Sequence, residues 1–341
     1  MGSVVIGAGA PVAVQSMTNT KTYDVAATVK QIKELEAAGC EIVRVSVPDD
    51  ASAAALPKIK EQINLPLVAD IHFKPSLAVK AIENGADKIR INPGTIRDKE
   101  RLKPVIQAAG ERNIPIRIGV NSGSLPQKLE ELRHSDLAKA LVEGTIETIR
   151  LFENEGFKNL VISCKASNVM ETIKAYEALS KNITYPLHLG ITEAGTMLSG
   201  SIKSAVGLGI LLYQGIGDTI RVSLTADPVE EVKTAYKILG ALGIRQRGVD
   251  VISCPSCARC DIDVISLADK VEQALAGIVK PMKVAVMGCE VNGPGEAKDA
   301  DVGLAAGRKS GLIFKKGRIV GKYPENELFD KLMEEVTNLS S

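Results

Sequence analysis

The stretch Leu67-Val-Ala-Asp-Ile-His-Phe-Lys-Pro-Ser-Leu-Ala-Val-Lys-Ala-Ile-Glu-Asn-Gly-Ala-Asp-Lys-Ile-Arg-Ile-Asn92 contains one complete strand–helix–strand unit. Two short runs containing β-branched residues, Leu67–Phe73 and Lys88–Asn92, flank an amphipathic segment, Pro75–Asn84. Gly85 follows this segment at the position expected of a helix C-cap. Because strands joined through a helix run parallel to one another, the stretch predicts a parallel sheet.

The same unit recurs through the first part of the chain. Short runs with β-branched residues alternate with amphipathic segments of helical spacing, such as Val25–Ala38. The eight strand candidates are Val12–Met17, Ile42–Val47, Leu67–Phe73, Lys88–Asn92, Pro115–Asn121, Asn159–Lys165, Pro186–Thr192 and Asp218–Leu224. Eight such units in about 240 residues predict a TIM (β/α)8 barrel, an α/β fold. A doubly wound open sheet is the alternative.

The composition is that of an aliphatic protein without a charge bias. Of its 341 residues 45% are hydrophobic, only 3% are aromatic and none is Trp, and the formal net charge is +1. This balance gives no argument for nucleic acid or a membrane surface as a partner. No apolar run approaches the roughly 20 residues needed to span a bilayer, and no secretory signal is visible. We expect a cytoplasmic protein, whose start close to the first strand leaves room for a short native leader.

A second, smaller α+β domain is expected after the barrel. The barrel is predicted to occupy residues 1–240, a polar, glycine-bearing linker residues 241–248, and the second domain residues 249–341. The predicted elements of this domain are strands at Val249–Ser253, Lys283–Met287 and near 301–304, 311–315 and 318–320, and helices at Ile262–Ile278 and Pro324–Leu339. Its first two strands each lead into a cysteine, so the cysteines could meet at one point.

These cysteines form a candidate metal site. Cys254 and Cys257 are a tight Cys-x-x-Cys pair, Cys289 lies on a glycine-rich turn, and Glu296 follows seven residues later. A redox dithiol usually stands alone, and a structural zinc site, which could use Cys260 as its fourth thiol, usually pairs two short knuckles. The arrangement favours an iron–sulfur cluster in which Glu296 is an oxygen ligand that a substrate can displace.

Basic residues occupy the strand ends of the predicted barrel, where TIM-barrel active sites lie. The five cations are Arg44, Arg90, Arg117, Lys165 and Arg221. Each could pair with a neighbouring carboxylate, but five cations buried inside apolar strands would be costly without an anionic ligand. Because the planar fork of arginine suits phosphate oxygens, the pattern predicts a bound diphosphate.

Further polar residues surround these cations. The strand ends also supply Asp70, His72, Asn92, Asn121, Glu193 and Ser223. A loop rich in Gly, Ser and Thr at 195–209 leads into a helix and could aim backbone N–H groups at phosphate. Taken alone, this loop is also consistent with close helix packing.

Together these segments resemble the 4-hydroxy-3-methylbut-2-enyl diphosphate synthase family, the iron–sulfur enzymes of the bacterial methylerythritol phosphate route to isoprenoids. The resemblance extends over nearly the whole chain. It rests on PVAVQSMTNT (11–20), VADIHF (68–73), KIRINPG (88–94), IRIGVNSGSL (116–125), LHLGITEAG (187–195), DTIRVSLT (218–225) and CEVNGPGE (289–296).

The resemblance implies a specific reaction. Members of the family open the ring of 2-C-methyl-D-erythritol 2,4-cyclodiphosphate and remove a hydroxyl, giving 4-hydroxy-3-methylbut-2-enyl diphosphate. Two electrons reach the substrate through a [4Fe–4S] cluster, and flavodoxin or ferredoxin supplies them. Such enzymes are typically head-to-tail homodimers in which the cluster domain of one subunit closes over the barrel of the other.

The resemblance also implies roles for individual residues. The implied cluster ligands are Cys254, Cys257, Cys289 and Glu296. The implied substrate-binding residues are Arg44, Arg90, Arg117, Asn121, Lys165, Arg221 and Ser223, to which we add Asp70, His72 and Asn92 from the same strand ends. Glu193 and Asn292 match polar residues near the reacting carbon, and together with Glu296 they are the candidate catalytic residues. Glu193 is the candidate proton donor, provided that burial raises its pKa.

One residue departs from the family pattern, because Cys260 adds a thiol where the family commonly has another residue. We expect Cys260 to be a bystander, since Glu296 retains the family spacing from Cys289. No extra domain lies between the barrel and the cluster unit, which is the two-domain form. A barrel enzyme acting on a pterin or sugar phosphate with structural zinc, and a non-catalytic iron–sulfur sensor, remain the alternatives.

Overall fold

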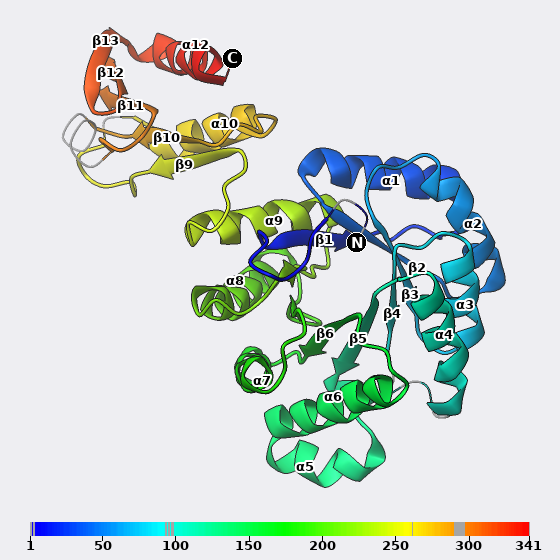
Figure 1. The fold of residues 1–341 in the computed structure, drawn as a ribbon. Helices are drawn as coiled ribbons and strands as arrows, with labels where there is room; N and C mark the ends of the chain where they lie inside the picture. The colour runs from blue at the N-terminus through cyan, green and yellow to red at the C-terminus, as the bar shows by residue number, and fades with distance from the viewer. Residues whose placement is uncertain are drawn as a thin grey trace. The chain divides into compact units, whose positions relative to one another are not determined.

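The protein forms two compact units, residues 1–245 and 246–341. The computed structural model describes residues 2, 4–92, 94, 96, 99–260, 262–289 and 297–340. The first unit is an α/β barrel, and the described residues of the second form a mixed sheet with helices α10 (Val264–Leu275) and α12 (Leu328–Ser340) packed against it (Figure 1).

Eight strands form the wall of the first unit. They are β1 (Ala13–Met17), β2 (Ile42–Ser46), β3 (Leu67–Ile71), β4 (Lys88–Ile91), β5 (Ile116–Asn121), β6 (Leu160–Lys165), β7 (His188–Leu189) and β8 (Thr219–Ile220). All neighbouring pairs are parallel, in the order β6-β5-β4-β3-β2-β1-β8-β7. The predicted TIM barrel is confirmed, although β7 and β8 are shorter than the predicted runs.

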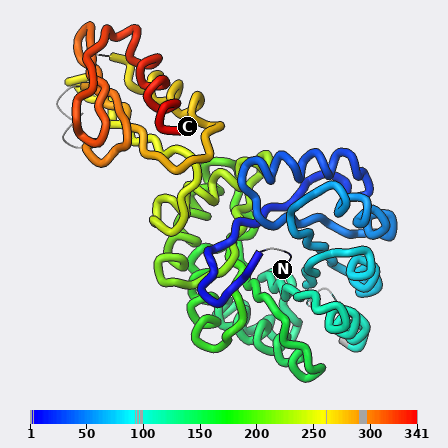
Figure 2. Tube along the Cα trace, turned by 45° about the horizontal axis from the view of Figure 1, so that its top comes forward, coloured from blue at the N-terminus to red at the C-terminus, as the bar shows by residue number. Residues whose placement is uncertain are grey.

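Helices surround this wall on the outside (Figure 1, Figure 2). They are α1 (Val25–Ala38), α2 (Asp50–Lys60), α3 (Pro75–Glu83), α4 (Lys103–Glu111), α5 (Glu130–Ser135), α6 (Leu137–Asn154), α7 (Val169–Asn182), α8 (Met197–Tyr213) and α9 (Pro228–Ala241). Asp or Asn begins several of them and accepts a backbone N–H bond, which stabilises a helix start by about 1 kcal/mol. Strand residues such as Ile89 and helix residues such as Leu56 and Leu141 belong to the same main core.

The inside of the barrel changes from apolar to polar along its axis. At the amino ends of the strands, Val4 and Ile6 pack against the buried side chains of Ala13, Ile42 and Val68. Most of the polar side chains described below lie further along the strands, toward their carboxyl ends. These apolar side chains therefore close the amino end of the barrel, and the opposite end is the expected position of the active site.

The barrel closes between β6 and β7, which are joined by an isolated bridge from Ile162 to Leu187. Tyr176 of α7 crosses this seam with a fully buried side chain. Its hydroxyl donates to the backbone oxygen of His188 at 2.6 Å and accepts from the backbone N–H of Cys164 at 3.0 Å. The Tyr176 side chain thus makes two hydrogen bonds across the seam between β6 and β7, where the two strands themselves are paired only by one bridge.

The second unit contains a five-stranded mixed sheet. Its strands, in the order β13-β12-β11-β10-β9, are β9 (Val249–Ser253), β10 (Met282–Met287), β11 (Val302–Gly307), β12 (Ser310–Lys315) and β13 (Arg318–Pro324). β9, β10 and β11 are parallel, whereas β12 and β13 are antiparallel to their neighbours. Helices α10 (Val264–Leu275) and α12 (Leu328–Ser340) pack with the sheet around Val271, Val284 and Leu332. The predicted order of strands and helices is confirmed.

We predict that Tyr176→Phe weakens the barrel at its seam. Removing the hydroxyl leaves the His188 carbonyl and the Cys164 N–H buried without this partner, which costs about 1–3 kcal/mol of unfolding free energy. Denaturant unfolding followed by circular dichroism measures the difference. Tyr185→Phe is the control, because its hydroxyl bonds Glu153 at an exposed position. Equal stability of both variants would contradict the role of Tyr176.

Candidate functional site

The barrel interior gathers the predicted cations. Arg44 on β2, Arg90 on β4, Arg117 on β5 and Lys165 on β6 are all at least nine-tenths buried. Arg221 follows β8 directly, and its side chain is 18% exposed. The five side chains influence one another electrostatically, because the pKa of Lys165 is lowered by the four arginines as well as by burial. The structure therefore brings all five together.

Asp70 on β3 binds three side chains of this group. Its carboxylate lies 3.0 Å from a terminal nitrogen of Arg90, 3.7 Å from Nε of Arg44 and 3.3 Å from Nε2 of His72. Burial raises the pKa of Asp70, but Arg44, His72 and Arg90 together hold that pKa well below its usual range. Asp70 is therefore a fixed negative charge that orients the cations around it.

A second carboxylate, which the sequence analysis missed, orients Arg221. Glu231 reaches into the barrel from α9 with 4% of its surface exposed. Its oxygens accept from the Arg221 guanidinium at 3.2 and 3.3 Å, from the Ser16 hydroxyl at 3.1 Å and from the Leu224 N–H at 3.0 Å. Because a carboxylate in the first turn of a helix is common, the sequence carried no distinctive signal for this role.

Arg117 and Lys165 lack such a partner among the described residues. The Arg117 side chain is 1% exposed, and its Nε and one terminal nitrogen have no hydrogen-bond partner in the part of the chain that the structure describes. Burial, together with Arg44 and Arg90, lowers the pKa of Arg117, and burial together with Arg117 lowers that of Lys165. Isolated buried cations are unfavourable, so these two side chains are suited to an anionic ligand.

Two glycines make room for the cations. A Cβ atom on Gly119 would lie 2.6 Å from Nε of Arg90, and one on Gly190 would lie 2.5 Å from Nζ of Lys165. Any other residue at either position would displace a cation. These glycines were not identified from the sequence, because the close approach arises between neighbouring strands.

The remaining predicted residues lie near the ends of the same strands. Asn92, after β4, donates to the Ser124 hydroxyl at 2.9 Å, and Asn121 ends β5 with its carbonyl accepting from Ser124 at 3.0 Å. Ser223 is partly exposed beyond β8. Glu193 is exposed at a left-handed φ of 52°, so the burial required for its predicted role as proton donor is not found in the barrel unit.

The stretch at 195–209 was predicted to be a loop that leads into a helix, but the structure makes nearly all of it helix, because only Gly195 and Thr196 precede α8. Helix α8 begins at Met197 after Thr196, whose side chain makes no capping bond. Thr196 pairs with Thr225 in an isolated parallel bridge, and the Thr225 N–H donates to Gly195 at 2.9 Å. The start of α8 therefore lies beside the segment that follows Arg221.

More polar groups lie deeper in the barrel than the sequence analysis predicted. Lys88 begins β4 and is fully buried, and burial with Arg117 lowers its pKa well below the ordinary value. His188 is also fully buried, with Nδ1 at 2.8 Å from the Thr219 hydroxyl. Met17 places its sulfur 2.9 Å from a terminal nitrogen of Arg44. The barrel therefore buries two basic side chains, Lys88 and His188, beyond the five cations that were predicted, and burial favours the uncharged form of each.

In the second unit, the cysteines follow two neighbouring parallel strands. Cys254 follows β9 and Cys289 follows β10, and Ser253 and Val286 are paired in the sheet. The Gly288 N–H donates to the Cys254 sulfur at 3.2 Å. Cys257 is exposed in the next loop, and the backbone N–H of Arg259 lowers the pKa of its thiol. Glu296 and Asn292 lie outside the described residues.

These residues can be compared with the needs of the predicted cluster. Within the described ranges, no three His, Cys, Asp or Glu side chains are gathered closely enough to hold a metal ion. The donor chemistry nevertheless fits, because thiolates are the ligands of iron–sulfur clusters and backbone N–H bonds to sulfur tune their potential. Cys254, which already accepts such a bond, and Cys289 leave adjacent strand ends.

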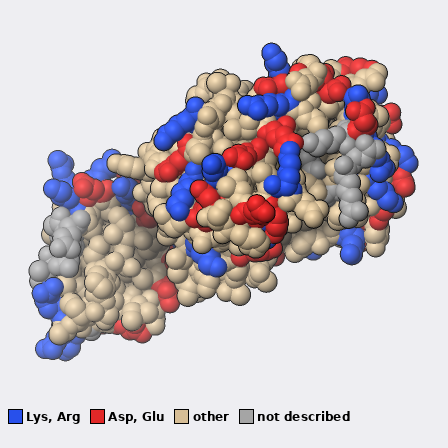
Figure 3. Space-filling model, turned by 90° about the horizontal axis from the view of Figure 1, so that it is seen from below, with Lys and Arg blue, Asp and Glu red and all other residues tan. Residues whose placement is uncertain are grey.

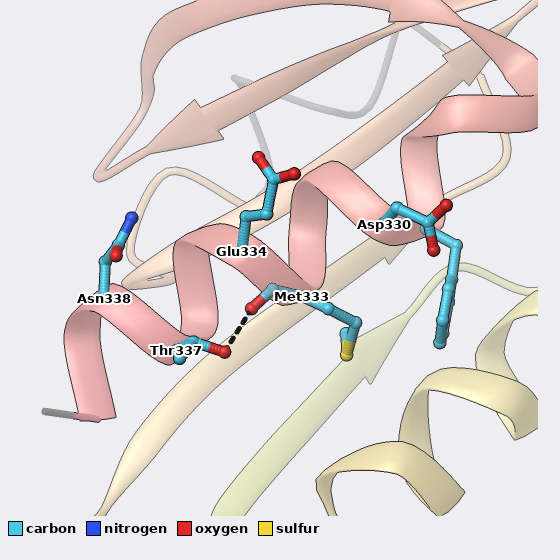
Figure 4. A pocket seen from close by; sticks show the side chains of 6 residues that line it. Asp330, Met333, Glu334, Thr337 and Asn338 are labelled. Atoms are coloured by element: carbon cyan, nitrogen blue, oxygen red, sulfur yellow. Dashed lines mark hydrogen bonds between the residues drawn. The ribbon is translucent and has the colours of Figure 1, made fainter.

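The surface of the second unit has a shallow hollow away from the cysteines. The hollow runs along α12 and is lined by Phe329, Asp330, Met333, Glu334, Thr337 and Asn338 (Figure 4). Positive and negative side chains are interspersed over the face of the barrel unit in Figure 3. Across the described ranges, every helix is too short or too polar to cross a membrane.

Comparison with solved structures agrees with the barrel fold. Solved structures of dihydropteroate synthases from Yersinia pestis and Coxiella burnetii superpose with TM-scores of 0.52 and 0.51. They cover 68% and 70% of this chain, and 92% and 96% of their own, at 14% and 13% identity. At such identity the likeness shows the barrel fold alone.

Sequence relatives cover almost the whole chain. The protein is 57% identical to a 4-hydroxy-3-methylbut-2-en-1-yl diphosphate synthase (flavodoxin) of Caldanaerobacter subterraneus, over 99% of this chain and 96% of the relative. It is 54% identical to the Geobacter sulfurreducens enzyme of the same name, over 99% and 96% of the two chains. Residues 1–236 match the GcpE TIM-barrel domain, and residues 250–338 match the GcpE protein C-terminal domain. The chain therefore belongs to the GcpE family of 4-hydroxy-3-methylbut-2-enyl diphosphate synthases.

Proposed function

We propose that the barrel of this chain binds a cyclic diphosphate and that its C-terminal unit supplies the electrons for the reduction. The chain converts 2-C-methyl-D-erythritol 2,4-cyclodiphosphate to 4-hydroxy-3-methylbut-2-enyl diphosphate, as an enzyme of its family. The observation that carries the substrate assignment is the burial of the Arg117 and Lys165 cations, neither of which forms an ion pair with a carboxylate of the described residues. Phosphate oxygens would supply the missing partners.

The carboxylates divide the cations into two classes. Asp70 and Glu231 fix Arg44, Arg90 and Arg221 before any substrate arrives, so these guanidiniums can offer their remaining N–H groups in set directions. Arg117 and Lys165 carry no such bond and would be neutralised by the diphosphate itself. A bound phosphate would raise the pKa of Lys165 and keep that amine protonated. His72, Asn92, Asn121 and Ser223 complete the polar lining.

The proposed cluster ligands are Cys254, Cys257, Cys289 and Glu296. When bound, a [4Fe–4S] cluster would transfer the two electrons, which we propose come from flavodoxin, as the names of the relatives indicate. Cys254 and Cys289 would be held by the ends of β9 and β10, and the Gly288 N–H would stabilise negative charge on the Cys254 sulfur. Glu193 is the proposed proton donor and Asn292 a proposed polar contact of the substrate.

We also propose that the enzyme is a homodimer, supported by an apolar row along α8. Leu198, Ile202, Val206 and Ile210 recur every four residues and are 74%, 56%, 46% and 37% exposed. Lys203 is the one charged residue of α8. A neutral apolar row can pack against its own copy about a two-fold axis without repulsion between like charges.

We predict that Arg117→Met separates activity from stability. It removes a buried cation without a protein partner, so the free energy of unfolding should stay constant or rise by about 1 kcal/mol. The kcat/KM for the cyclodiphosphate should fall by roughly 100-fold, because an arginine bond to phosphate contributes about 3 kcal/mol. Anaerobic steady-state assays and denaturant unfolding measure the two quantities.

Arg221→Met is the matched comparison for this experiment. It leaves Glu231 buried without its cation, so both activity and stability should fall, the latter by about 3 kcal/mol. If Arg117→Met loses as much stability as Arg221→Met, Arg117 has a structural role and the proposed ligand contact is wrong.

We predict that protein purified without oxygen contains about four iron and four sulfide per chain, as a single [4Fe–4S] cluster requires. Serine variants of Cys254, Cys257 and Cys289 should each lose most of the iron. Cys40→Ala should retain it, because Cys40 is buried in the barrel unit. Glu296→Ala should keep a more labile cluster with an altered electron paramagnetic resonance signal. Zinc in place of iron would refute the cluster, and an unchanged signal would refute Glu296 as a ligand.

We predict that the double variant Ile202→Asp/Val206→Asp dissociates the dimer, because two new carboxylates would face their copies across the axis. Light scattering after size-exclusion chromatography should give half the mass of the wild type. Ala54→Asp, which adds a charge at an exposed position of α2, is the control and should remain dimeric. A double variant with the mass of the wild type would place the interface elsewhere.

A further inference from the structure

The loop after β9 contains a second Cys-x-x-Cys pair, Cys257-Ala-Arg-Cys260. The Cys260 N–H donates to the Cys257 carbonyl at 2.9 Å, which closes a turn with Ala258 and Arg259 at its centre. The first and fourth Cα atoms of such a turn lie within about 7 Å. Disulfides form across Cα separations of about 4.4–6.8 Å. The turn therefore holds these two cysteines at a distance that a disulfide can bridge.

The other cysteines of this unit are held differently. The Cys254 N–H donates to the Val286 carbonyl at 3.4 Å, which continues the pairing of β9 with β10, and its sulfur accepts from Gly288. No backbone hydrogen bond among the described residues closes a turn from Cys254 to Cys257. Cys289 is buried at the end of β10. Cys257 and Cys260 are therefore the favoured pair.

The two thiols differ in accessibility. Cys257 is exposed, so a small molecule in solution can reach it. Cys260 is partly buried, and a Cβ atom on Gly288 would lie 2.4 Å from its sulfur and 3.2 Å from Cβ of Val264. Gly288 thus leaves the space that Cys260 occupies behind the exposed thiol. This is the arrangement of an attacking and a resolving cysteine.

We propose that Cys257 and Cys260 are a reversible dithiol that closes to a disulfide when no cluster is bound. The oxidant is a small-molecule disulfide. The Cys257 thiolate attacks one of its sulfurs and expels one thiolate, and Cys260 then loses its proton, attacks the Cys257 sulfur and expels the second. The protein gives up two protons and two electrons, and the oxidant becomes two thiols.

This modification would compete with the cluster. Cys257 is a ligand in the proposed function, and this consequence of the inference rests on that assignment. A sulfur in a disulfide cannot also be a thiolate ligand of iron. The disulfide would protect Cys257 from irreversible oxidation and delay cluster assembly until a reductant reopens the pair. Cys260, expected from the sequence to be a bystander, would then have a role of its own.

Peptide mapping of the full-length chain tests the proposal. Cluster-free protein is equilibrated in buffers of glutathione and glutathione disulfide, its free thiols are blocked with a maleimide, and it is cut with trypsin. Because Arg259 separates the two cysteines, the peptides 248–259 and 260–270 stay joined only by a disulfide. The joined pair should increase with the proportion of glutathione disulfide and disappear on reduction, and fragment ions should place the bond at Cys257 rather than Cys254.

Cys260→Ser is the matched variant, because it removes none of the proposed ligands. It should give at least about tenfold less joined peptide than the wild type and should accumulate glutathione on Cys257. Cys260→Ala, which also fits beside Gly288, should behave in the same way. Free thiols throughout the wild type, or a bond from Cys254 or Cys289 to Cys260, would overturn the inference.

A second measurement separates this inference from the proposed function. Oxidised wild-type protein is incubated with iron and sulfide before and after reduction with dithiothreitol, and bound iron is counted. Uptake only after reduction supports both assignments. A mapped Cys257–Cys260 bond in a protein that never takes up iron supports the dithiol and refutes the cluster. Full iron uptake by the oxidised protein would show that the disulfide does not prevent cluster binding, and would refute that part of the proposal.

Discussion

The structure of the barrel site depends on the burial of more positive than negative charge in one closed sheet. Asp70 and Glu231 lie among Arg44, Arg90 and Arg221, and bind these three guanidiniums in defined directions. Without these carboxylates the cations would repel one another in a medium that screens charge poorly. The carboxylates are too few to balance every cation, and the remaining charge of Arg117 and Lys165 is what makes the barrel suited to a diphosphate.

The rest of the barrel accommodates this charge. Lys165 and Arg221 lie at or just beyond the carboxyl ends of their strands, Arg44 and Arg90 lie within β2 and β4, and Arg117 lies near the start of β5. The amino ends of β1, β2 and β3 are closed by Ala13, Ile42 and Val68. Gly119 and Gly190 leave out side chains so that Arg90 and Lys165 can extend past the neighbouring strand. Because β6 and β7 share only a short pairing, the Tyr176 hydroxyl also supports the wall that carries Lys165.

The second unit uses the same principle of delivering reactive groups from strand ends. Parallel pairing of β9 with β10 places Cys254 and Cys289 just beyond the ends of neighbouring strands. Gly288, which precedes Cys289, lies close to both Cys254 and Cys260. Its N–H binds the Cys254 sulfur, and its missing side chain leaves space for Cys260. A single glycine thus contacts one cysteine of the proposed cluster site and one of the proposed dithiol.

The sequence by itself determined the order of elements, the barrel, the second unit and the identity of the five cations. The spacing of hydrophobic residues, glycines at helix ends and charged residues within apolar runs are signals that each lie within a short stretch of sequence. It could not show that Asp70 holds Arg44 and Arg90, that Glu231 reaches Arg221 from a helix, or that Lys88 and His188 are buried beneath them. The predicted role of Glu193 as proton donor required burial, which the sequence could not establish, and the barrel unit leaves that side chain exposed. These properties were decided only by the tertiary structure, since they depend on which side chains from distant segments meet and how much water they exclude.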